Sequence, residues 1–105
     1  MRDEELRQVR VVAWDRRGDE VGFQLRLVPL GERRWGAEAP DDLVDVVERD
    51  PRVRLEDGTA GAARVLRSGR THAEVHGRLH PRRGARLREP RGPVVVIETG
   101  HGADH

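Results

Sequence analysis

The residues best suited to chemistry lie between Thr71 and His80. This segment contains histidines at positions 72, 76 and 80, with a glutamate at 74. We predict a strand here, on which alternate side chains share a face. That face would contain His72, Glu74, His76, Arg78 and His80. Imidazole and carboxylate groups so spaced can ligate a divalent metal. An exposed polar strand face has the same pattern, and Arg78 would repel a cation. The sequence therefore assigns no metal site.

Few other side chains could take part in catalysis. Ser68 is the only serine, and its place beside Gly69 is typical of a turn. Cysteine is absent, which excludes disulfides, thiol catalysis and cysteine-ligated zinc. All 20 basic residues are arginine, so no lysine can form a Schiff base. The glycines do not have the spacing of a dinucleotide-binding loop. No catalytic residue is assigned.

Charge is distributed unevenly, although the net charge is only +1. Residues 1–50 contain 9 arginines and 13 acidic residues, whereas residues 51–105 contain 11 arginines and 6 acidic residues. The basic excess lies in residues 64–91, which could neutralise nucleic-acid phosphates or pair with the acidic half of the same protein. This segment contains no aromatic residue on which bases could stack. Nucleic-acid binding is therefore kept as an alternative function.

The elements that would position these residues are mostly strands. Residues 41–50 have the apolar spacing of a short helix, which ends because Pro51 disfavours a helical Asp50. Alternating or continuous apolar patterns predict strands at 8–15, 21–28, 33–39, 52–56, 64–67, 70–80 and 94–97. We expect Phe23, Leu25, Leu43, Val47, Val53 and Val95 to be buried. The predicted fold class is mainly β: a small split β-barrel or closed antiparallel sheet with one short inserted helix.

Length and composition favour one domain. We assign residues 1–98 to a single β-barrel-like domain, with a short helical lead-in at 1–6 and a loop at 81–93, and residues 99–105 to a disordered tail. Only 35% of the 105 residues are hydrophobic, so we expect a homodimer that buries further apolar surface. The chain contains neither a signal peptide pattern nor a membrane-spanning apolar run, and we expect a soluble cytoplasmic protein.

The order of strand, short helix, proline and strand resembles that of the split-barrel flavin-binding superfamily. The matching pieces are residues 50–55, with the sequence DPRVRL, and residues 74–78, with the sequence EVHGR. The resemblance covers residues 9–79. The superfamily includes the pyridoxamine phosphate oxidase-like and deazaflavin-dependent reductase families. It implies FMN or F420 bound at a dimer interface and hydride transfer to a small oxidised substrate.

The resemblance also implies site residues. Arg33 and Arg34 correspond to the basic residues that hold the cofactor phosphate, and Trp35 would border the flavin ring. Asp41 and Asp42 depart from the family pattern, because carboxylates at a helix N-terminus disfavour a phosphate there. A dimeric split barrel that has lost catalysis is therefore a further alternative.

Overall fold

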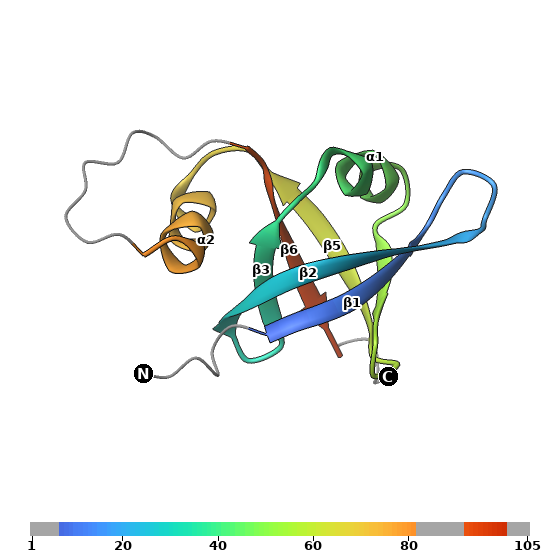
Figure 1. Ribbon diagram of the computed structural model, residues 1–105, viewed down its shortest axis with the longest axis horizontal. Coiled ribbons are helices and arrows are strands. Elements are labelled where there is room, and N and C mark those ends of the chain that lie inside the picture. The colour runs from blue at the N-terminus through green and yellow to red at the C-terminus, as the bar shows by residue number, and fades with distance from the viewer. Residues whose placement is uncertain (1–6, 82–91, 101–105) are drawn as a thin grey trace.

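The computed structural model describes residues 7–81 and 92–100. Within them the chain forms six strands and two helices (Figure 1). The order is β1 (Arg7–Trp14), β2 (Glu20–Gly31), β3 (Arg34–Glu38), α1 (Asp41–Arg49), β4 (Arg52–Leu55), β5 (Ala60–Leu66), α2 (Arg70–Leu79) and β6 (Val94–Thr99).

The six strands close into an antiparallel barrel. Their order around it is β1-β2-β3-β6-β5-β4, and the β1–β4 pair closes the ring through Val11 opposite Leu55. β6 comes last in the chain but lies between β3 and β5. The predicted fold class, a small closed β-barrel, is confirmed.

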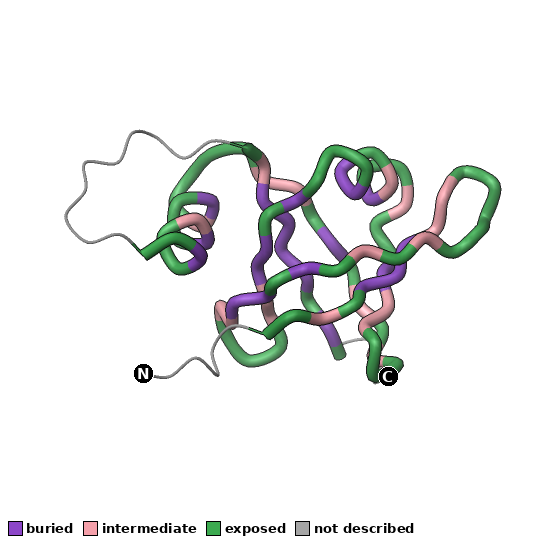
Figure 2. Tube along the Cα trace, viewed as in Figure 1, coloured by how far each residue is buried: buried purple, intermediate pink, exposed green. Residues whose placement is uncertain are grey.

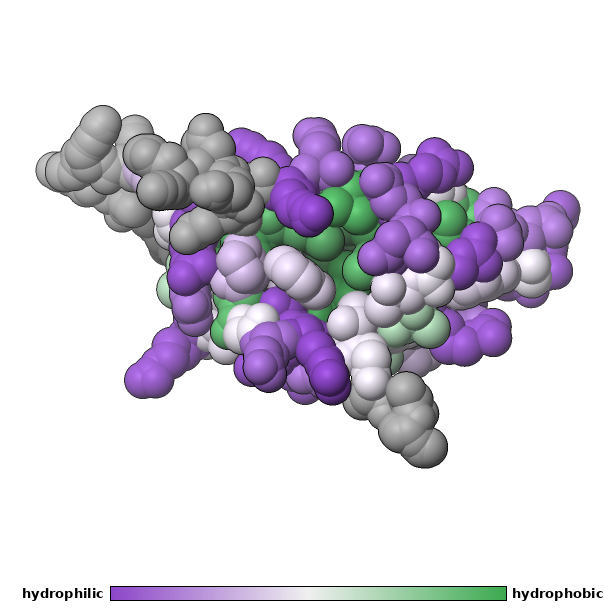
Figure 3. Space-filling model, turned by 90° about the horizontal axis from the view of Figure 1, so that it is seen from below, coloured by the Kyte–Doolittle hydropathy of each residue, from purple (hydrophilic) through white to green (hydrophobic). Residues whose placement is uncertain are grey.

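Apolar side chains from every strand fill the barrel. Leu25, Leu43, Val47, Val53 and Val95 are buried as predicted, whereas Phe23 is only partly buried. Figure 2 shows buried residues concentrated in the strands and on the inner sides of both helices. Viewed from below, the molecule shows hydrophobic side chains at its centre and hydrophilic ones around them (Figure 3).

The first helix forms where the sequence predicts it. α1 begins after Pro40 and ends at Asp50, whose backbone N–H still donates to the Val46 carbonyl. Its buried residues Leu43, Val44 and Val47 join the interior core. Because a nine-residue helix is marginal in water, this packing against the barrel is what stabilises it.

The predicted strand at residues 70–80 is wrong, because this segment is the helix α2. Its apolar residues satisfy two periods at once: they alternate, yet Val75 and Leu79 also lie four positions apart and bury the same helix face. Gly69, with φ of 104°, provides the turn before the helix, and Pro81 follows its end. The segment forms a helix because the helical spacing buries Val75 and Leu79 together against the barrel.

α2 packs on the outside of the barrel and forms a second, smaller core. Val75 and Leu79 contact Val28 and Val94 there. Neighbouring β6 residues serve the other core, since Val95 and Ile97 face the barrel interior. This explains the continuous apolar run of β6, which is buried on both faces as predicted for an interior strand.

Three strands extend beyond their predicted ranges. β2 continues to Gly31, although the predicted strand ends at residue 28. β5 begins at Ala60, so the small residues before Arg64 belong to the strand. β6 continues to Thr99, which is buried, although the predicted tail begins at that residue. Residues 101–105 of the tail, the lead-in at 1–6 and the loop residues 82–91 lie outside the described residues. No helix in the described part of the chain is long and apolar enough to cross a membrane.

Candidate functional site

His76 of α2, His80 directly after this helix and Glu38 of β3 form a cluster of metal-ligating groups in the described residues. Glu38 Oε2 lies 2.8 Å from His80 Nε2 and 3.7 Å from His76 Nδ1. All three ligand atoms lie within 4.8 Å of one another. Glu38 and His80 are about half exposed, whereas the side chain of His76 is 11% exposed. The cluster therefore lies at the surface with one partly buried member, His76.

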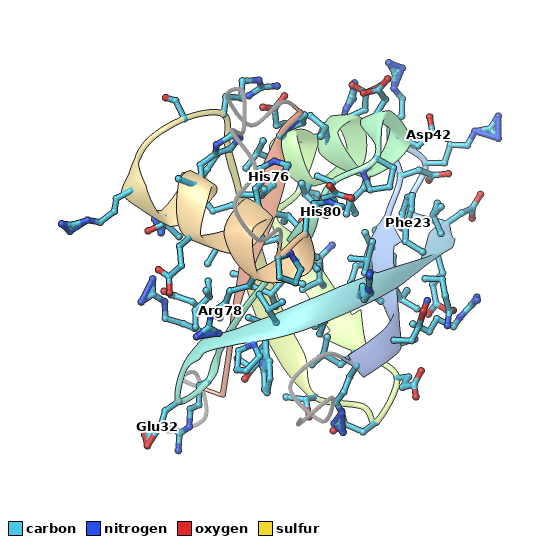
Figure 4. The ribbon with its side chains drawn as sticks, turned by 60° about the vertical axis from the view of Figure 1, so that its left-hand side comes forward. Phe23, Glu32, Asp42, His76, Arg78 and His80 are labelled. Carbon is cyan, nitrogen blue, oxygen red and sulfur yellow. The ribbon has the colours of Figure 1, made fainter. Side chains whose placement is uncertain are left out.

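The fold brings these residues together in two ways. His76 and His80 are four positions apart, which places them on one side of α2. Glu38 is the last residue of β3 and pairs with Val94 of β6. Figure 4 shows His76 and His80 side by side on α2, with Arg78 on the other side of the helix. Packing of α2 against β3 and β6 brings the imidazoles to the glutamate.

The carbonyl oxygen of Gly92 fixes the orientation of His72, which is buried, and of His76, which is partly buried. It accepts hydrogen bonds from His72 Nε2 at 2.8 Å and from His76 Nε2 at 3.1 Å. Since a carbonyl can only accept, each Nε2 must carry a proton. In a neutral His76 the Nδ1 lone pair is then free and faces Glu38. His72, only 4% exposed, packs edge-on against the His76 ring at 4.8 Å.

Because residues 70–79 form a helix, two residues of the predicted polar face do not lie beside the histidines. Glu74 and Arg78 lie two positions from His76, which is about 200° around a helix and thus on its far side. Arg78 Nη1 donates to the Pro29 carbonyl at 2.7 Å instead. The predicted shared face of His72, Glu74, His76, Arg78 and His80 is therefore wrong, and Arg78 does not occupy the histidine face.

A cleft of about 440 Å³ adjoins the cluster. Glu38 and His76 both line it, together with polar residues of β1 and β2 and apolar residues of several elements. The polar residues are Gln8, Gln24 and Arg26, and the apolar ones include Leu25, Pro40 and Leu79. One wall thus carries hydrogen-bonding groups and a positive charge.

The predicted cofactor residues lie elsewhere and do not converge. Arg33 is exposed in the β2–β3 turn, with φ of 134°. Arg34 Nε lies 3.4 Å from Glu98 Oε2 on the neighbouring strand. Trp35 packs against the interior core and lines a smaller cavity of about 150 Å³. Consecutive strand residues point to opposite faces, so Arg34 and Trp35 do not share one.

The basic segment is partly engaged within the protein. Arg67 Nη1 lies 2.9 Å from Glu48 Oε2, and Arg78 bonds to Pro29 as described. Arg67 therefore pairs with the acidic half, as one of the sequence hypotheses proposed. Residues 82–91 of the segment lie outside the described residues.

Sequence reasoning missed Glu38 as a member of the site. The four-residue spacing of the histidines was the available signal, because it places them on one helix face. Nothing local pointed to Glu38, since its proximity depends on how α2 docks on the barrel.

The comparisons with known proteins support the fold. No protein-family model matches the sequence, and the search of characterised proteins finds no significant match. A crystal structure of a tagged histidine-to-alanine variant of HupZ from Group A Streptococcus is similar, with a TM-score of 0.68 and 14% sequence identity. The match covers 90% of this chain and 86% of HupZ. Together with the closed six-stranded barrel, this likeness supports a split-barrel fold.

Proposed function

We propose that this protein is a split barrel that binds a small organic molecule of the cofactor class in the cleft between α2 and the barrel. The observation that carries the proposal is the lining of that cleft. Its volume of about 440 Å³ falls within the range of roughly 300–1,000 Å³ typical of small-molecule sites. Its wall combines apolar residues with a few polar ones, as such sites do.

The polar groups indicate the chemistry of the ligand. The Arg26 guanidinium can hold an anionic group, and the amides of Gln8 and Gln24 can donate and accept hydrogen bonds. Glu38 and His76, which also line the cleft, can accept or donate a proton. A planar, hydrogen-bonding molecule with one anionic arm suits this arrangement, and FMN and F420 belong to that class.

The position of the anionic arm has two alternatives. Asp41 and Asp42 follow Pro40 at the rim of the cleft and disfavour a phosphate at the α1 N-terminus. Arg26 would therefore hold it if the ligand fills this cleft. The sequence prediction instead places it at Arg33, Arg34 or an arginine of the second half of the chain, with the ring near Trp35.

Titration of the purified chain with FMN and with F420, followed by the absorbance of each cofactor, tests the proposal. Arg26→Ala should weaken binding roughly tenfold or more, since a hydrogen bond to a charged group contributes about 1.5–3 kcal/mol. Arg16→Ala, in the exposed β1–β2 turn, is the matched control and should leave the affinity unchanged.

Three results would redirect the proposal. A loss of binding in Arg33→Ala and Arg34→Ala, but not in Arg26→Ala, would place the ligand at the sequence-predicted site. No binding of either cofactor at tens of micromolar would reject the flavin class. Salt-sensitive binding of RNA or DNA would then favour the nucleic-acid alternative. The homodimer remains a prediction, which sedimentation velocity at micromolar concentration checks.

A further inference from the structure

We propose that Glu38, His76 and His80 form a binding site for a divalent transition metal, with Zn²⁺ as its reference ion. Two imidazole nitrogens and one carboxylate oxygen are a common set of three protein ligands for zinc. The inference concerns these three side chains and holds whether or not an organic ligand fills the cleft.

The distances fit such an ion. Ligand atoms about 2.0–2.1 Å from a tetrahedral zinc lie roughly 3.3 Å from one another. Here Glu38 Oε2 lies 2.8 Å from His80 Nε2 and 3.7 Å from His76 Nδ1. All three ligand atoms lie within 4.8 Å of one another, and side-chain rotations would draw them closer around one ion. His80 and Glu38 are exposed enough to make these rotations.

The hydrogen-bonding pattern prepares His76 as a ligand. A metal-bound histidine usually donates its other ring N–H to a carboxylate or backbone carbonyl, which fixes the tautomer and ring orientation. His76 does this through Nε2 to the Gly92 carbonyl, and leaves Nδ1 directed toward Glu38. His80 would bind through Nε2, so the proton through which Nε2 bonds to Glu38 in the metal-free protein would then lie on Nδ1.

The charge and donor types select the class of metal. Glu38 contributes one negative charge, and Arg78 bonds to Pro29 on the far side of α2. Imidazole donors suit Zn²⁺, Cu²⁺, Ni²⁺ and Fe²⁺, whereas Mg²⁺ and Ca²⁺ favour oxygen ligands. The site should therefore discriminate against Mg²⁺ and Ca²⁺.

Three protein ligands leave one position open, as in catalytic rather than structural zinc sites. Since Glu38 and His76 both line the cleft, a molecule entering it could reach that position. Gly77 lies where a zinc protease helix of the His-Glu-x-x-His type carries its glutamate base. α2 therefore offers the ligand spacing of that motif without its general base.

Isothermal titration of the full-length chain with Zn²⁺, and with Co²⁺ followed by visible absorption, tests the site. We expect one ion per chain and a cobalt spectrum typical of nitrogen and oxygen ligands. Glu38→Gln and His80→Ala each remove a ligand from an exposed position. Both should weaken Zn²⁺ binding by at least the roughly 10–100-fold that loss of a ligand's hydrogen-bond partner costs.

Two controls make the result specific. Glu74→Gln, on the opposite face of α2, should bind Zn²⁺ as the unaltered chain does. Circular dichroism of each variant establishes that the fold is retained. Absence of Zn²⁺ and Co²⁺ binding in the unaltered chain would overturn the proposal. Unchanged binding in Glu38→Gln and His80→Ala would also overturn it, as would binding that is lost when His101 and His105 are replaced by alanine.

Discussion

The carboxylate of Glu38 lies 2.8 Å from the imidazole of His80, although the two residues are 42 positions apart in the sequence. Glu38 is the last residue of β3, and His80 directly follows the last residue of α2. Their contact therefore depends on how α2 packs on the outside of the barrel. Substitutions that alter the packing of α2 should change the geometry of the Glu38, His76 and His80 cluster as well as the stability of the protein.

Gly36 sets how closely α2 approaches β3. A Cβ atom at this buried position would lie 2.5 Å from Val75 Cγ2 and 3.2 Å from Leu30 Cδ1. Val75 is fully buried and its branched side chain is stiff, so it cannot turn aside cheaply. Gly36→Ala should therefore lower the free energy of unfolding by about 1–3 kcal/mol, the usual cost of overpacking.

A double-mutant cycle measured by urea denaturation checks this contact. Val75→Ala alone should destabilise the protein by leaving a cavity. Combined with Gly36→Ala, it should cost less than the sum of the two single changes, because the new methyl group enters the space that Val75 vacates. Strictly additive effects would show that the two residues do not limit helix docking.

Gly77 is an exposed glycine inside α2, and a methyl group there would contact nothing within 4 Å. Glycine is less favourable than alanine in a helix interior by about 0.8–1.0 kcal/mol. Gly77→Ala should raise the free energy of unfolding by about that amount and increase the Tm. Scanning calorimetry provides the measurement, and a lower Tm would mean that residues 70–79 do not form a helix.

The Asp50 carboxylate stabilises the folded protein, and this contribution is lost in acid. Hydrogen bonds from the Arg52 guanidinium, at 2.7 and 3.0 Å, hold the pKa of Asp50 below its usual 3.8. A lowered folded-state pKa means that this contribution is present above about pH 3.8 and is lost as the pH falls through the lower value. The stability difference between the unaltered chain and Asp50→Asn should thus be constant near neutral pH and change below about pH 3.8.

The pKa itself can be followed by NMR titration of the Asp50 carboxyl carbon. Arg52→Gln should move that pKa back toward 3.8, because it removes the charged donor. An unchanged pKa in this variant would assign the shift to another cause. Both side chains are at the surface, so added salt should reduce the effect.

The sequence alone determined the architecture wherever one local pattern had one solution. Pro51 ended α1 at Asp50, and the apolar run 94–97 required a strand covered on both faces. The barrel class followed from these elements, since the alternating segments each needed to bury one face.

Tertiary structure decided what those patterns left ambiguous. Residues 70–80 satisfy both a strand and a helix period, and only the apolar surface of Val28 and Val94 selected the helix. That choice removed Glu74 and Arg78 from the histidine face. It also brought Glu38, from a distant strand, to His76 and His80. A contact between distant segments depends on how their elements dock, and no local sequence pattern encodes that geometry.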